Sequence, residues 1–134
     1  MELGQVYRRL GAEVSVIEYA DRITPVMDAG LSRELMKVLK KQGVQFFLSH
    51  GVNKVERKGD VVHVTATDKK GGEIDFQGDY CLVSVGRRPY TDGLNAQAAG
   101  VQINEKGQVV VNDHLQTTAK NIYAIGDVVQ GAML

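Results

Sequence analysis

The sequence predicts an α/β fold in which a parallel sheet carries an inserted antiparallel sheet of three strands. Over the first 48 residues, stretches with helical apolar spacing alternate with short apolar strands. Three short stretches of alternating apolar and polar residues follow, at 52–56, 61–67 and 73–76, and an apolar run then resumes at 79–85. Alternating helices and strands require right-handed crossovers, so the first part of the chain predicts a parallel sheet.

Composition limits the class of protein. The 134 residues include 16 basic and 16 acidic side chains, a formal net charge of zero. This length suits one domain with a real core, and the missing basic excess argues against a nucleic-acid binder. No apolar run approaches the roughly 20 residues of a membrane span, and residues 1–4 are unlike a signal peptide. We therefore expect a cytoplasmic protein.

The first helix and strand are indicated by spacing. A glycine, Gly11, stands where a helix would end, after four apolar residues with helical spacing: Leu3, Val6, Tyr7 and Leu10. Residues 13–18 then alternate into a strand that ends at Glu18.

A second helix and strand follow a loop at 19–27. Asp28 is a plausible N-cap and Gly43 closes the helix. Its apolar stripe consists of Leu31, Leu35, Val38 and Leu39, and residues 44–48 form the next strand.

The second half of the chain is less regular. The strand at 79–85 contains the single cysteine, Cys81, which we expect to be buried and inert. Gly86-Arg87-Arg88-Pro89 breaks this strand, and a further strand is expected at 108–111. The run at 121–125 predicts a buried strand that leads to a glycine and a carboxylate.

Several polar residues have both a functional and a structural interpretation. Asp127, just past a strand end, suits a ligand hydroxyl, yet Asp also favours such positions as a cap. Glu18, also at a strand end, could accept both ribose hydroxyls of an adenosine and repel a 2′-phosphate, or be a surface residue. Arg87 and Arg88 could pair with a pyrophosphate or lie on the surface between two domains. The three histidines are expected to face solvent.

Three motifs together resemble a known family. They are the closing Asn-Ile-Tyr-Ala-Ile-Gly-Asp-Val-Val-x-Gly-x-Met-Leu, the earlier Gly-Ala-Glu-Val-Ser-Val-Ile-Glu, and Gly-Arg-Arg-Pro. They resemble the pyridine nucleotide-disulfide oxidoreductases, and dihydrolipoamide dehydrogenases in particular. The resemblance implies a truncated Rossmann-like sheet whose first strand and glycine-rich loop would precede Met1. It also implies an incomplete NAD-binding domain at 1–89 and the start of a second FAD-binding segment at 90–134.

The same resemblance assigns cofactor contacts. For FAD, it implies that Asp127 accepts from the ribityl chain and that Met133 and Leu134 lie against the flavin. For NAD it implies four residues: Glu2 near the nicotinamide, Glu18 on the ribose, Val52 against the adenine, and Gly86 passing the cofactor. Chemistry alone leaves three alternatives open: Glu2 as a first-turn helix charge, Val52 as core, and Gly86 as a strand breaker.

The family's activity would need groups that these residues do not provide. The redox pair Cys-x-x-x-x-Cys and the His-Glu dyad are both missing, so no catalytic residue is expected here. No metal ligand is expected either. The parent enzyme would oxidise dihydrolipoamide with FAD and NAD as a homodimer, and its partner would be the lipoyl-bearing protein of a 2-oxo acid dehydrogenase complex. The chain alone should be inactive and should bind neither cofactor tightly. The alternatives are a mercuric reductase or NADH peroxidase fragment and a non-catalytic nucleotide-binding module.

A missing central strand would leave two strands, 13–18 and 79–85, without a neighbour. Three arrangements could compensate: residues 121–125 fill the gap, two chains pair, or the two strands close directly on each other.

Overall fold

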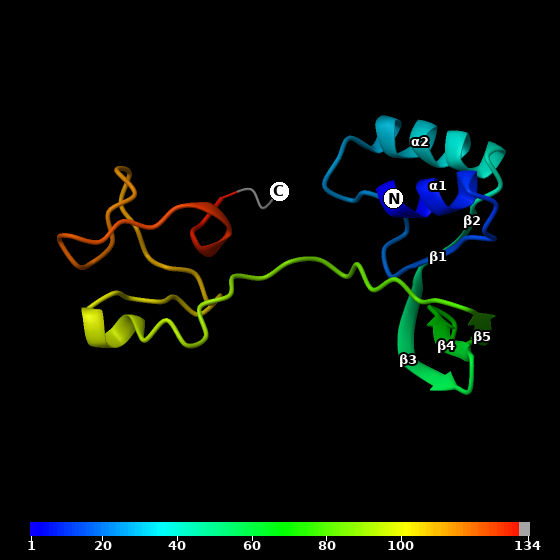
Figure 1. Cartoon of the computed structure of the whole chain (residues 1–134). Helices are drawn as coiled ribbons and strands as arrows, with labels where there is room; N and C mark the ends of the chain where they lie inside the picture. Colours follow the sequence, from blue (N-terminus) through cyan, green and yellow to red (C-terminus); the bar gives the residue numbers. More distant parts are fainter. Residues whose placement is uncertain (132–134) are drawn as a thin grey trace. The chain divides into compact units, whose positions relative to one another are not determined.

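The computed structural model describes residues 1–131, which form two compact units: Met1–Leu82, and a second unit that begins at Val83. Figure 1 shows that both long helices and all five strands belong to the first unit. The predicted functional boundary after residue 89 remains a prediction. No helix in the described part of the chain is long and apolar enough to cross a membrane.

Both predicted helices form. α1 spans Glu2–Arg9 and α2 spans Ala29–Lys41. Asp28 caps α2 as expected, because its Oδ1 accepts hydrogen bonds from the backbone N–H groups of Gly30 (2.7 Å) and Leu31 (3.2 Å). A glycine with positive φ follows each helix, Gly11 at +101° and Gly43 at +91°.

The predicted α/β class, with its parallel sheet, is confirmed. β1 (Ser15–Glu18) pairs in parallel with β2 (Gln45–Leu48), and the register places Glu18 opposite Leu48. Beneath α2, the core of this unit is formed by Ile23, Leu39 and Val44, which are almost fully buried. Because the two strands run in parallel and end together, their carboxyl ends share one edge of the sheet.

The inserted antiparallel sheet is also confirmed. It consists of β3 (His50–Lys58), β4 (Val61–Asp68) and β5 (Glu73–Gly78), with β4 in the centre. Ala66, on the central strand, is completely buried. A T-shaped contact between Phe47 of β2 and Phe76 of β5, with ring centroids 4.6 Å apart, packs this sheet against the parallel one.

A carboxylate organises the turn between β4 and β5. Oδ1 of Asp68 accepts hydrogen bonds from the backbone N–H groups of Lys70 (2.7 Å) and Gly72 (2.8 Å). The backbone donors of Gly72 and then Lys70 hold the pKa of Asp68 below its ordinary value. Asp68 therefore fixes the turn that joins β4 to β5.

This turn should make the protein less stable in acid. A carboxylate whose folded pKa is lowered stabilises the fold above its unfolded pKa, and that contribution is lost as the pH falls through the folded value. The urea concentration at the unfolding midpoint should therefore decrease as the pH is lowered below about 4. In Asp68→Asn this decrease with pH should be smaller. Asp60→Asn is the control, since Asp60 pairs with Arg57 at 3.6 Å in the preceding turn. A wild-type slope in Asp68→Asn would contradict the assignment.

Burial of the first helix differs from expectation. The apolar stripe that predicted α1 is half exposed or more, with Leu3 at 51%, Tyr7 at 52% and Leu10 at 79%. The side of α1 that meets the sheet instead includes Gly4, where an added Cβ would lie 3.7 Å from Val14. The spacing therefore predicted the helix correctly, but the two-stranded parallel sheet covers only part of its apolar surface.

The predicted strand at 79–85 does not form. Neither sheet of the described residues includes this segment, and Val85 is 92% exposed. Cys81 is exposed, so the prediction of a buried thiol is wrong. The physical reason is that strand formation requires a neighbouring strand to accept and donate backbone hydrogen bonds.

As far as residue 131, the second unit consists of turns, isolated bridges and two short 3₁₀ helices, η1 (Ala96–Ala99) and η2 (Gly126–Val128). Its small core is formed by Ala96, Val101, Val109 and Val129. The strands predicted here are reduced to three single bridges: Ile103 with Val109, Val111 with Thr117, and Gln116 with Tyr123.

The closing apolar run is not a buried strand, because Ile125 is 71% exposed. Tyr123 makes its bridge to Gln116, inside the second unit. Within the described residues, the parallel sheet of the first unit contains β1 and β2 alone. Pairing between two chains remains a prediction.

Candidate functional site

One candidate site lies at the carboxyl ends of β1 and β2. Glu18 ends β1 and is half-buried, and its Oε1 accepts a hydrogen bond from the backbone N–H of Ala20 at 2.8 Å. The backbone N–H of Ser49 donates to the carbonyl of Ala20, also at 2.8 Å. The loop after β1 is therefore fixed to the end of β2. A carboxylate has about four acceptor positions, so Glu18 keeps capacity for a ligand hydroxyl.

Two neighbours of Glu18 extend this site onto β3. The ring of Tyr19 lies against Gly51, because an added Cβ on Gly51 would be 3.5 Å from the ring Cδ2. Val52 follows Gly51 and is 48% exposed, so the alternative that Val52 belongs to the core is wrong. The structure thus places the ring of Tyr19, the residue after Glu18, against the β3 residue that precedes Val52. Tyr19 was not predicted as a site residue, although its position directly after a strand-end carboxylate was a usable signal.

Glu2 occupies the first turn of α1 and is exposed. A carboxylate there interacts favourably with the helix dipole, which agrees with the structural alternative of a first-turn helix charge. Its role near a nicotinamide remains a prediction.

A second candidate site surrounds Asp127 in the second unit. Asp127 lies in η2, directly after Gly126, whose φ of +81° favours glycine. Oδ2 of Asp127 forms an ion pair with Nη1 of Arg87 at 3.2 Å. Both partners belong to the same unit, so in the structure Arg87 anchors the Gly126–Val128 turn.

The other predicted flavin and NAD positions in this unit are less informative. Gly86 has a φ of +108° and open space where a Cβ would be, so the backbone conformation explains the glycine. Its contact with a cofactor remains a prediction. Met133 and Leu134 lie outside the described residues.

The histidines differ partly from expectation. His50 and His63 are half-buried, whereas His114 is exposed as expected. Nδ1 of His63 lies 3.3 Å from Oδ2 of Asp75, and the hydrogen bond with His63 is the main cause that lowers the pKa of Asp75. Within residues 1–131, no three His, Cys, Asp or Glu side chains cluster as metal ligands would.

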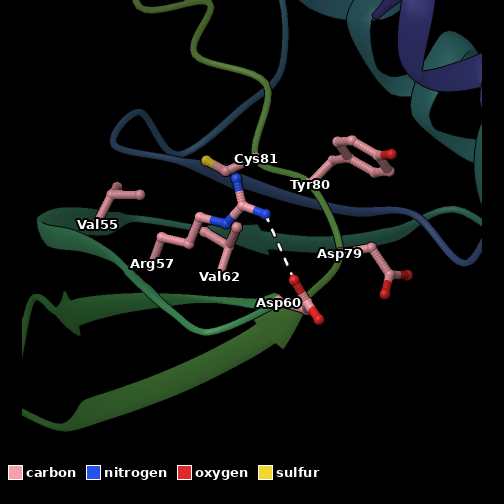
Figure 2. Close-up of a pocket in the computed structure, with 7 residues that line it drawn as sticks. All are labelled: Val55, Arg57, Asp60, Val62, Asp79, Tyr80 and Cys81. Carbon is pink, nitrogen blue, oxygen red and sulfur yellow. Dashed lines mark ion pairs between the residues drawn. The ribbon is translucent and has the colours of Figure 1, made fainter.

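Figure 2 shows a surface pocket at the edge of the antiparallel sheet. Two of its charged groups have partners, since Arg57 donates from Nε to the carbonyl of Gly59 (3.0 Å) and pairs with Asp60 at 3.6 Å. Cys81 and Tyr80 line the other wall. The pocket includes none of the residues predicted to bind a cofactor.

Known proteins are similar to this chain over its whole length. The sequence profile described as "Pyridine nucleotide-disulphide oxidoreductase" matches residues 1–134. A leghemoglobin reductase of Glycine max is 42% identical over 135 residues, covering 100% of this chain and 26% of the relative. The mitochondrial dihydrolipoyl dehydrogenase of Pisum sativum is also 42% identical, with 100% and 27% covered. Dihydrolipoyl dehydrogenase 3 of Pseudomonas putida is 41% identical, with 100% and 29% covered.

Solved structures give the same result. The flavoprotein disulfide reductase RclA of Escherichia coli superposes with a TM-score of 0.87 at 30% identity, covering 99% of this chain and 29% of that protein. LpdA of Mycobacterium tuberculosis superposes with a TM-score of 0.84 at 29% identity, covering 98% and 28%. The chain therefore spans less than a third of the length of each of these proteins.

Proposed function

Because the chain belongs to the pyridine nucleotide-disulphide oxidoreductase family, we propose that it is the cofactor-binding segment of a dihydrolipoyl dehydrogenase. The complete enzyme would convert dihydrolipoamide and NAD⁺ to lipoamide and NADH, with FAD as the intermediate electron carrier. Relatives named dihydrolipoyl dehydrogenase, about 40% identical over the whole chain, support this reaction over others in the family.

The observation that carries the proposal is the position of Glu18. Ligands of open α/β sheets bind beyond the carboxyl ends of the strands, and Glu18 ends β1 at that edge. Its ionised carboxylate accepts hydrogen bonds only, which suits the two hydroxyls of an adenosine ribose. A 2′-phosphate would meet a like charge, so the site favours NAD over NADP.

Asp127 has the chemistry required for the flavin side. Arg87 holds Oδ2 of this carboxylate at 3.2 Å, and the side chain is still 44% exposed. An oriented, accessible carboxylate can accept a hydrogen bond from a ribityl hydroxyl. The flavin, when bound, supplies the redox chemistry, and these residues bind and orient it.

The chain by itself is not expected to catalyse this reaction. It contains one cysteine, whereas dithiol oxidation requires a cysteine pair. We propose that the complete protein is a homodimer that serves a lipoyl-bearing partner of a 2-oxo acid dehydrogenase complex. A cytoplasmic location remains a prediction, and some curated relatives are mitochondrial.

A chimera tests the proposal. Residues 1–134 would replace the matching segment of the Pisum sativum dihydrolipoyl dehydrogenase, which supplies the rest of the enzyme. The purified chimera should retain FAD and reduce NAD⁺ with dihydrolipoamide. An Asp127→Ala version should lose FAD, whereas Asp113→Ala, at another exposed position in the same unit, should retain it. A folded chimera that holds FAD but does not reduce NAD⁺ would contradict the proposal.

A further inference from the structure

Tyr19 is unusual among the residues near Glu18 because a large ring is held in place and yet remains open to solvent. Its side chain is 80% exposed. The backbone on both sides of it is fixed: Glu18 ends a hydrogen-bonded strand, and Ala20 is held both by the Glu18 carboxylate and by Ser49. The loop therefore presents the ring at a defined place, instead of leaving it on a free segment.

Gly51 determines where the ring lies. An added Cβ on Gly51 would be 3.5 Å from Cδ2 and 3.8 Å from Cε2, so one edge of the ring is in contact with the β3 backbone. With only an edge of the ring in contact there, most of the ring surface is left available.

We propose that Tyr19 stacks on the adenine of a bound adenine nucleotide. This inference rests on the proposed function, since Glu18 would take the ribose of the same nucleotide. Adenosine consists of a planar apolar base joined to a sugar with two neighbouring hydroxyls. The site offers an exposed aromatic ring directly after a strand-end carboxylate, in the same order. Stacking of a base on an aromatic ring stabilises nucleotide complexes, so the ring is a principal determinant of affinity.

AMP is the probe, because it includes the base and the ribose but needs no pyrophosphate loop. Binding of AMP to the 134-residue chain would be followed by two-dimensional amide NMR. AMP should shift the amides of residues 18–20 and 51–52, and AMP carrying a 2′-phosphate should bind more weakly. Tyr19→Ala should weaken AMP binding about tenfold, and Tyr19→Phe should restore it, because the ring face and not the hydroxyl makes the contact.

Tyr80→Ala is the matched control, because Tyr80 is 95% exposed in the same unit and lines the pocket in Figure 2, which includes neither Glu18 nor Tyr19. It should leave AMP affinity unchanged. Tyr19 is largely exposed, so its replacement should also leave the amide spectrum of β1 and β2 unchanged. AMP binding to Tyr19→Ala with wild-type affinity would overturn the stacking role and leave the Glu18 site intact. No response to AMP in the wild-type chain would overturn both.

Discussion

Replacing Leu39 with alanine is expected to lower the free energy of unfolding by about 3 kcal/mol. Leu39 is 3% exposed, and it packs with Ile23 and Val44 in the core between α2 and the parallel sheet. Truncation removes buried methyl groups and leaves a cavity that the rigid strand β2 cannot fill. Urea denaturation of the 134-residue chain measures the change, with circular dichroism reporting the loss of the helices of the first unit.

Leu31→Ala is the control for this prediction. It makes the same chemical change on the same helix, where Leu31 is 59% exposed. It should cost less than about 1 kcal/mol. Equal losses in the two variants would mean that Leu39 is not at the centre of a core.

Replacing Glu18 with alanine in the chimera is expected to raise the KM for NAD⁺ about tenfold or more, with kcat little changed. The reason is that a charged acceptor contributes roughly 1.5–3 kcal/mol per hydrogen bond, and this contact binds the nucleotide away from the reacting ring. Steady-state kinetics with dihydrolipoamide in excess measures both constants.

The control replaces a carboxylate that lies just before the same strand. Glu13→Ala removes an exposed acidic side chain on the amino-terminal side of β1, far along the strand from the proposed ribose site. It should leave the KM for NAD⁺ unchanged. A Glu18→Ala chimera with wild-type KM would remove the observation on which the proposed function rests.

Local elements could be predicted from the sequence because local interactions determine them. The Asp28 cap, the glycines after each helix, and the alternating strands β3–β5 all form as expected. The exposure of the α1 stripe and the absence of a strand at 79–85 in the described structure could not be predicted. Both depend on which segments, distant in the sequence, lie next to these residues. The same periodicity is compatible with a covered and with an uncovered helix face.

The candidate site shows the same division. Glu18 could be recognised from its place at a strand end, and Asp127 from its place after Gly126. Tyr19 was missed because its ring position is set by Gly51, which is far along the chain. The Arg87–Asp127 ion pair joins residues 40 apart, and no local pattern indicates such a contact.

We propose that Glu18, at the carboxyl end of β1, binds the ribose of a nucleotide. Calorimetric titration with NAD⁺ tests it most directly, with this chain compared with a version extended by a strand and a G-x-G-x-x-G loop ahead of residue 1. The 134-residue chain should bind NAD⁺ at least about tenfold more weakly than the extended version, and Glu18→Ala should weaken binding by the extended version about tenfold or more. Equally tight binding by the short chain, or binding by the extended chain that is unaffected by Glu18→Ala, would contradict it.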